Sequence, residues 1–154
     1  MKPKAICLVG HENWGKSDTL YYLVGESRHR KWFKINGKDV FARHMSNDDR
    51  PDSFFNFIDA LNTREKPYVI IALCPNFNNP EARTDEILNI LQRLGYRLYF
   101  WVLHNQYGSS EVISAEETAT LAKYGEVEVY RGAGEAPARA IAFKAYLSRI
   151  LQYE

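Results

Sequence analysis

Hydrophobic positions along the chain fall into two patterns that alternate. Short continuous apolar runs at 5–9, 68–74 and 98–103 predict strands that are buried on both faces. Apolar residues at helical spacing follow them, and five helices are predicted over about 16–24, 51–62, 79–94, 114–123 and 137–151. Alternating strands and helices require a mostly parallel sheet with helices on both faces. We therefore predict an α/β fold built as a three-layer sandwich.

Two further strands are predicted to pair as a hairpin. The segments 31–35 and 39–45 are aromatic and β-branched, and Asn36-Gly37 lies between them. This dipeptide is the strongest short signal for a two-residue hairpin turn, so the two strands are expected to be antiparallel and to lie at an edge of the sheet. A last strand is predicted at 127–130, before the C-terminal helix.

Capping residues set several of the predicted helix ends. Gly25 and Gly95 follow helical segments in the position where a left-handed cap is most easily formed. Asn79-Pro80 is predicted to open the third helix, since proline is favoured at the first helical position. Ser114 with Glu117 has the pattern of a capping box and is predicted to begin the fourth helix.

Length, composition and charge describe an ordinary globular protein. The 154 residues include 20 Lys plus Arg against 19 Asp plus Glu, and 45% are hydrophobic. A chain of this length buries roughly 68–70% of the surface exposed on unfolding, so we expect a single domain, residues 1–154, that needs no disulfide or structural metal. The net charge of +1 argues against a protein built to coat nucleic acid or an anionic membrane.

Neither a membrane segment nor a disulfide framework is evident. The longest apolar run, 68–74, is far shorter than the roughly 20 residues that span a bilayer, and the N-terminus lacks the features of a signal peptide. We therefore expect a cytoplasmic protein without a membrane partner. Cys7 and Cys74 lie inside apolar runs and lack metal-binding spacing, which predicts buried reduced thiols.

One motif carries specific chemistry. Residues 10–17, Gly-His-Glu-Asn-Trp-Gly-Lys-Ser, match G-x-x-x-x-G-K-[ST] at every fixed position and lie between a predicted strand and a predicted helix. Backbone N–H groups of such a loop wrap phosphates, and the following helix N-terminus carries positive partial charge. Lys16 is expected to reach the β- and γ-phosphates as the catalytic cation, and Ser17 is expected to bind Mg²⁺. Trp14 could stack on a base or a partner, or it could shield the outer side of the loop.

On this motif the chain resembles the P-loop NTPase superfamily, and its element order is similar to that of the small Ras-like GTPases. That resemblance implies Asp-x-x-Gly after the second hairpin strand, where the chain has Asp48-Asp49-Arg50-Pro51. An aspartate is retained, but Pro51 has no N–H to offer a γ-phosphate. Asp48 and Asp49 are candidates for second-sphere Mg²⁺ binding, because they come directly after an apolar strand that could lie beside the P-loop strand. Equally, they could cap the helix at 51–62.

The base-reading signature of these GTPases is also incomplete. Asn-Lys-x-Asp is implied after the strand at 98–103, and the chain has Asn105-Gln106-Tyr107-Gly108. Only Asn105 matches, and the carboxylate that would accept both guanine N–H groups is absent. Residues 132–134 lie where the family has its Ser-Ala-Lys loop, and residues 25–31 are too few for a full first switch loop. ATP is therefore slightly favoured over GTP.

A weaker resemblance is to small P-loop nucleotide or polynucleotide kinases. The strand at 68–74, a helix containing Arg83 and the strand at 98–103 are similar to the middle of those enzymes. Their first strand commonly ends in an Asp, and Cys74 or Pro75 stands in its place here. Arg83 and Arg93 could reach a phosphate or could be solvated helix residues.

A basic and aromatic cluster and two histidines complete the candidates. Residues 28–34, Arg-His-Arg-Lys-Trp-Phe-Lys, could hold a nucleic-acid backbone or a second phosphate, or could protect an exposed sheet edge with charge. Nucleic acid is the less favoured partner. His44 and His104 lie at strand ends without metal spacing and are expected to be packed or surface residues.

The sequence thus predicts a protein that binds a nucleoside triphosphate with Mg²⁺, ATP or GTP, with slow hydrolysis if it is catalytic. The alternatives are a degenerate GTPase-like module that binds a protein partner without catalysis, and a small kinase that transfers the γ-phosphate to a nucleotide or polynucleotide. Lys16 is the predicted catalytic residue, and Ser17 and Asp48 are the predicted metal-binding residues. The predicted nucleotide-binding residues are Gly10, Asn13, Trp14, Gly15, Lys16, Ser17, Asp18 and Asn105.

Overall fold

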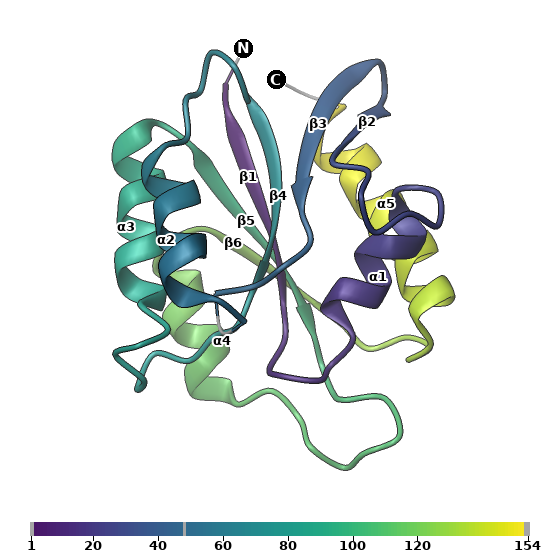
Figure 1. Ribbon diagram of the computed structural model, residues 1–154. Coiled ribbons are helices and arrows are strands. Elements are labelled where there is room, and N and C mark those ends of the chain that lie inside the picture. Colours follow the sequence, from purple (N-terminus) through teal and green to yellow (C-terminus); the bar gives the residue numbers. More distant parts are fainter. Residues whose placement is uncertain (1, 48, 153–154) are drawn as a thin grey trace.

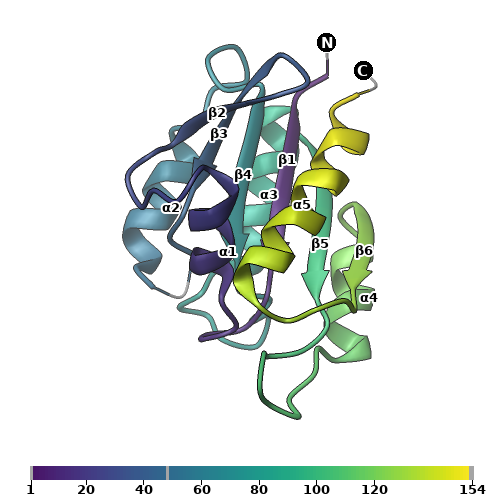
Figure 2. The same ribbon diagram turned by 90° about the vertical axis from the view of Figure 1, so that its right-hand side faces the viewer.

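Six strands form one sheet, with helices on both of its faces, in a computed structural model that describes residues 2–47 and 49–152 (Figure 1). The elements follow the chain as β1 (Lys4–Val9), α1 (Lys16–Leu23), β2 (Trp32–Ile35), β3 (Lys38–Arg43), α2 (Pro51–Asp59), β4 (Tyr68–Leu73), α3 (Thr84–Leu94), β5 (Arg97–Leu103), α4 (Ala115–Ala122), β6 (Glu126–Tyr130) and α5 (Ala136–Ile150). Helices α1 and α5 cover one face, and α2, α3 and α4 cover the other (Figures 1 and 2). The predicted three-layer α/β sandwich is confirmed.

The strand order is β2-β3-β4-β1-β5-β6, and only β2 and β3 pair antiparallel. Strand β1 lies at the centre, with Val9 beside Leu73 of β4 and Val102 of β5. All residues of β1 and β4 are buried, as continuous apolar runs in a covered parallel sheet require. The expectation that β3 could lie beside the P-loop strand is wrong, because β4 is inserted between them.

The hairpin at the sheet edge has the predicted turn. Ile35 pairs with Lys38, which leaves Asn36 and Gly37 as the two turn residues. Their φ angles are 51° and 76°, so both adopt the left-handed conformation that a type I′ turn requires and that Asn and Gly tolerate best. The edge position of β2 and the antiparallel pairing are confirmed.

Of two predicted helix starts, one is confirmed and one is wrong. Ser114 Oγ accepts the N–H of Glu117, and Glu117 Oε1 accepts the N–H of Ser114, which completes the predicted capping box of α4. The prediction that Asn79-Pro80 opens α3 is wrong. Asn79 instead forms a separate turn, and Arg83 with φ 55° interrupts the helical path, so α3 begins at Thr84.

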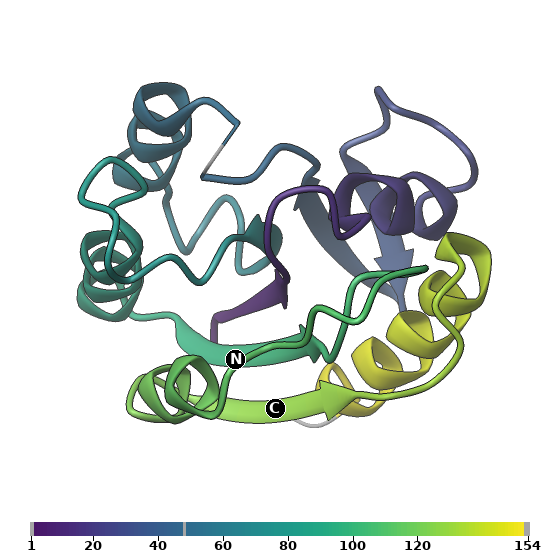
Figure 3. The ribbon, with the colours of Figure 1, turned by 90° about the horizontal axis from the view of Figure 1, so that it is seen from below.

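The side chains of the central strands make up most of the core. On the face covered by α5, Trp101 of β5 stacks on Phe143 with ring centroids 4.9 Å apart. Cys7 and Cys74 are both buried, as predicted, and neither forms a disulfide within residues 2–47 and 49–152. The carboxyl ends of the parallel strands meet at one edge of the sheet, where the loops after β1, β4 and β5 come together (Figure 3).

Candidate functional site

The loop between β1 and α1 wraps tightly at the carboxyl end of the sheet. Gly10 N–H donates to Leu73 O at 3.1 Å, which ties the start of the loop to β4. A methyl group added at Gly10 would lie 3.2 Å from Leu103 Cδ1, so the loop passes close to the end of β5. Gly15 has φ 85°, a conformation that glycine adopts without strain, and α1 begins at the next residue. These features form a cradle of backbone at a helix N-terminus.

Lys16 is folded back over this loop. Its side chain is nearly buried, and Nζ donates to Gly10 O at 2.6 Å and to His11 O at 2.9 Å. These two carbonyls hold the ammonium group above the mouth of the loop, so a bound phosphate would not have to order a freely rotating lysine chain. The structure thus places the predicted catalytic cation at the loop.

A cavity of about 330 Å³ opens beside the loop. Ser17 and Asp49 both line it, although β4 separates the strands that lead to them. The N–H of Ser46 donates to Asp49 Oδ2 at 3.0 Å, which fixes that carboxylate at the cavity wall. The cavity is lined by Glu12, Asn13, Trp14, Gly15, Lys16, Ser17, Asp18, His44, Ser46, Asp49 and Ala72. Asp48, the predicted metal-binding residue, lies outside the described residues.

The residues present fit a magnesium ion of the kind that P-loop proteins use. In the described ranges 2–47 and 49–152, no group of three or more His, Cys, Asp or Glu side chains could hold a metal by itself. Magnesium keeps several waters and binds through one or two protein groups together with substrate phosphates, so it needs no such cage. The Ser17 hydroxyl and the Asp49 carboxylate are suitable donors, and both face the cavity beside Lys16.

Asp18, a predicted nucleotide-binding residue, lines the cavity and also pairs with an arginine. It lies in the first turn of α1, where its charge suits the helix dipole, and it accepts from Arg28 Nη2 at 2.9 Å. The same guanidinium lies 3.5 Å from Ser17 Oγ and packs over the ring of Tyr21. Arg28 therefore brings the short loop after α1 to the edge of the cavity.

Trp14 is buried within the loop. Only 2% of its surface is exposed, and its Cβ lies 3.3 Å from the position of a methyl group at Gly10. Stacking on a base or a partner, one of the two alternatives, is therefore wrong for this conformation. Its indole Nε1 has no hydrogen-bond partner in the described part of the chain, and its ring packs against His11 edge to face. Trp14 packs the loop from inside.

Arg139 of α5 ties the loop 10–17 to the loop after β5, and no pattern in the sequence indicated this role. Only 3% of the residue is exposed, Nη1 donates to Trp14 O, and Nη2 donates to Asn105 O at 2.8 Å. Among the described residues its guanidinium forms no ion pair, and its Nε has no partner. Burial lowers the pKa of Arg139. A buried cation without a counter-ion is costly, and this one lies directly behind the loop.

The loop after β5 differs from a guanine-reading loop. Asn105 Nδ2 donates to Gln106 O at 3.1 Å, so the amide is engaged within its own loop. Gln106 Nε2 donates to Asn13 O at 3.0 Å and thereby supports the phosphate loop from outside. Gly108 has φ 76°, and a methyl group at Gly134 would lie 2.7 Å from Tyr107 Cδ2. Residues 105–108 include no carboxylate.

His44 also lines the cavity. Its Nε2 lies 3.0 Å from Arg30 O, and because a carbonyl only accepts, Nε2 carries a proton. Burial is the largest effect and lowers the pKa of His44, and the nearby charges of Arg28 and Lys31 lower it too, while the bond to Arg30 opposes them. The imidazole is a neutral group of this wall, a placement that strand-end position alone did not indicate.

The basic segment after α1 is exposed. Arg28, His29, Arg30, Lys31 and Trp32 all lie at the surface. In the described ranges, no helix is both long enough and apolar enough to cross a membrane.

Comparisons with known proteins identify the fold. No family model and no curated protein matches the chain. Among solved structures, the chain is similar to the FeoB G-domain from Methanococcus jannaschii, with a TM-score of 0.56 and 18% sequence identity. The match covers 99% of this chain and 100% of that one. At this identity the likeness shows the fold alone, and the chain shares the overall fold of that G-domain.

Proposed function

We propose that this protein binds a nucleoside triphosphate together with Mg²⁺ at the loop 10–17. The observation that carries the proposal is the pre-positioned Lys16, held by Gly10 O and His11 O at the N-terminus of α1 beside a cavity of about 330 Å³. Backbone N–H groups, a helix dipole and a fixed cation together form an anion site. The fold likeness to a G-domain supports the same assignment.

Charge around the cavity argues for a metal-dependent ligand. Glu12, Asp18 and Asp49 line it together with Lys16, and only Asp18 has an arginine partner. The negative charges of a triphosphate and of these carboxylates would repel each other unless a divalent cation lay between them. When bound, Mg²⁺ would neutralise phosphate charge, and Ser17 and Asp49 would hold it, the latter directly or through water.

The base preference is proposed to be small. Within the loop 105–108, the side chains of Asn105 and Gln106 donate to backbone carbonyls of the protein. None of the four residues supplies a carboxylate to accept the guanine N–H groups. ATP is therefore expected to bind slightly better than GTP, and most of the affinity is expected to come from the phosphates.

Catalysis is proposed to be slow or absent. Pro51 begins α2 and has no N–H for a γ-phosphate, so the segment after β3 lacks the sensing group that a hydrolytic switch needs. This observation favours the second candidate function, a nucleotide-binding module without turnover. Phosphate release in water, measured against transfer to an added nucleotide or polynucleotide, separates that module from an NTPase and from a kinase.

Isothermal titration of the purified chain with ATP, GTP, ADP and GDP, with and without Mg²⁺, tests the proposal. We expect micromolar binding of the triphosphates that depends on Mg²⁺, and Ser17→Ala should remove most of that dependence. Arg64→Ala, an exposed change remote from the loop, is the matched control and should bind like the parent. Absence of binding for all four nucleotides would contradict the proposal.

A further inference from the structure

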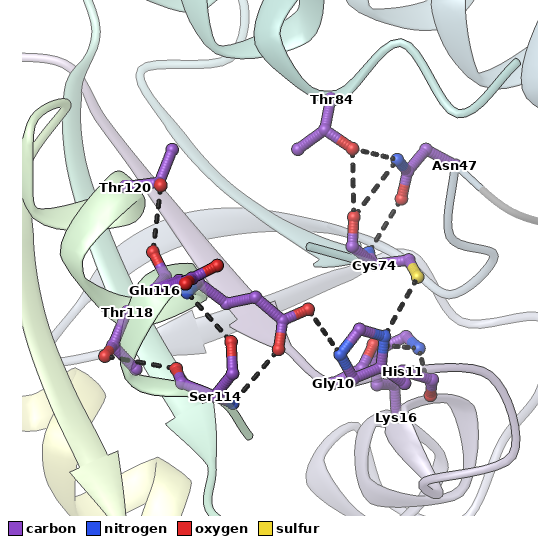
Figure 4. Close-up of polar contacts among 11 residues, drawn as sticks. Gly10, His11, Lys16, Asn47, Cys74, Thr84, Ser114, Glu116, Thr118 and Thr120 are labelled. Atoms are coloured by element: carbon purple, nitrogen blue, oxygen red, sulfur yellow. Dashed lines mark hydrogen bonds and ion pairs between the residues drawn. The ribbon is translucent and has the colours of Figure 1, made fainter. Parts of the chain in front are cut away.

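Three side chains form a continuous relay: His11 belongs to the loop 10–17, Cys74 directly follows β4, and Glu117 lies on α4. Glu117 Oε2 on α4 lies 2.6 Å from His11 Nε2, and His11 Nδ1 lies 3.9 Å from Cys74 Sγ, at the end of β4 (Figure 4). The two contacts use opposite nitrogens of one ring. The relay therefore runs thiol, imidazole, carboxylate, the order that activates cysteine nucleophiles.

Each end of the relay is fixed by its own surroundings. Glu117 is held by the capping box, in which its other oxygen accepts the Ser114 N–H at 3.0 Å. The backbone of Cys74 is held by Asn47, whose Oδ1 accepts the Cys74 N–H at 2.7 Å, and by Thr84 Oγ1, which donates to Cys74 O at 3.1 Å. The contact between ring and thiol is thus set by secondary structure that packs around it (Figure 4).

Proton positions follow from these contacts. A carboxylate only accepts, so His11 Nε2 carries the proton of the short bond to Glu117. In the neutral imidazole, Nδ1 then presents a lone pair toward Cys74 Sγ. The thiol can donate to that lone pair, and the carboxylate would stabilise the imidazolium formed if the proton moves.

We propose that Cys74 is an activated thiol, supported by His11 and Glu117, that hydrogen peroxide oxidises to a sulfenic acid. The sulfur attacks one peroxide oxygen, the S–O bond forms and the O–O bond breaks. His11 Nδ1 takes the thiol proton and passes it to the departing hydroxide, which leaves as water, so that the imidazole returns to its neutral form. Sulfur is oxidised by two electrons and the peroxide is reduced. This modification site does not depend on nucleotide binding.

Cys7 provides an internal comparison. It lies on β1, is fully buried, and burial raises the pKa of its thiol. Cys74 is 3% exposed and contacts His11, whose side chain is 31% exposed, so its sulfur lies nearer to solvent than that of Cys7. The two thiols therefore differ in the groups that contact them and in their exposure.

The test separates activation of the Cys74 thiol by His11 from its exposure to peroxide. The full chain is treated with hydrogen peroxide at fixed pH, then unfolded, and the thiols that remain are alkylated and quantified for each cysteine by mass spectrometry. We expect Cys74 to be lost at least tenfold faster than Cys7. Glu117→Gln keeps a capping residue, since glutamine also serves in a capping box, and should slow Cys74 oxidation severalfold.

His11→Ala gives the decisive outcome. It uncovers the thiol but removes the group that takes its proton, so activation predicts at least tenfold slower oxidation and simple exposure predicts faster oxidation. Faster or unchanged oxidation in His11→Ala, with Glu117→Gln also unchanged, would overturn the proposal. Circular dichroism of both variants checks that they are folded.

A second readout links the thiol to the proposed nucleotide site and rests on that proposal. The carbonyl of His11 holds Lys16, so an added oxygen on the neighbouring sulfur should weaken triphosphate binding. Loss of affinity on oxidation that Cys74→Ser prevents would support this link. If the reduced protein binds no triphosphate, the proposed function fails, while the oxidation rates still decide the thiol proposal.

Discussion

The two ends of the candidate nucleotide site differ in how their side chains are placed for a ligand. At the phosphate end, Lys16 is buried, doubly hydrogen-bonded and aimed at a formed cavity. At the base end, Asn105 bonds within its own loop and Tyr107 lies exposed against Gly134. Both ends are connected through Arg139, which donates to carbonyls of both loops.

If the site binds as proposed, its recognition would depend mainly on the phosphate end. Phosphate binding depends on backbone N–H groups and one lysine, which the fold itself positions. Guanine selection depends on one carboxylate at the end of a loop, and a buried base N–H left without it is costly. A chain can therefore lose selectivity for the base while its phosphate loop stays intact.

Lys16→Ala is expected to have the largest effect, because it removes the cation of the phosphate end. Charged hydrogen bonds contribute about 1.5–3 kcal/mol each, so triphosphate affinity should fall by roughly 100-fold. The thermal unfolding transition should remain cooperative. Lys31→Ala, an exposed lysine, is the control and should bind like the parent. Unchanged affinity in Lys16→Ala would remove the phosphate-site assignment.

Arg139→Met tests whether the link between the two ends serves the phosphate end. The variant keeps side-chain volume but leaves the Trp14 and Asn105 carbonyls without their donor. We therefore expect the affinities for ATP and for inorganic tripolyphosphate to fall by the same factor of about tenfold, or about 1.4 kcal/mol. Arg149→Met, on the exposed side of the same helix, is the matched control. A loss confined to ATP would place Arg139 on the base end instead.

Gly108→Asp restores the residue type that the guanine signature has at this position. Because Gly108 has φ 76°, an aspartate there would be strained and would not take the guanine-reading orientation. The ratio of GTP to ATP affinity should therefore change by less than about twofold, well under 1 kcal/mol. Titration of both nucleotides measures it. A tenfold gain for GTP would show that the base end is a guanine site lacking one group.

Stability against pH gives the smallest expected effect. Because the pKa of His44 is lowered in the folded protein, the unfolded chain takes up that proton first as pH falls. Stability should thus be complete above the ordinary histidine pKa of about 6.5 and should decline as pH falls below it. The decline in Tm should be flatter in His44→Gln, by no more than the roughly 2–4 °C that 1 kcal/mol gives in a chain of this size. An equally steep decline in that variant would contradict the assignment.

Local chemistry explains what the sequence predicted well. The strand–loop–helix arrangement around residues 10–17, the Asn36-Gly37 turn and the Ser114–Glu117 capping box each depend on residues close to one another in sequence. The start of α3 was misjudged because Arg83 adopts a left-handed conformation that its residue type does not announce.

Features that depend on strand order were not predictable in the same way. The insertion of β4 between β3 and β1 brings Cys74 beside His11, and no spacing along the chain indicates that contact. Arg139 lies 125 residues from Trp14 in sequence, and on a helical pattern it resembles an ordinary surface arginine. Asp49 was a candidate on sequence grounds, but its place in the wall of the cavity depends on the path of the loop after β3.

The most direct test of the central claim is titration of the chain with inorganic tripolyphosphate in the presence of Mg²⁺, beside ATP under the same conditions. If the phosphate end carries recognition, tripolyphosphate should bind within about tenfold of ATP, a difference of no more than about 1.4 kcal/mol. Binding of ATP without measurable binding of tripolyphosphate would contradict the account, because the affinity would then come from the base end.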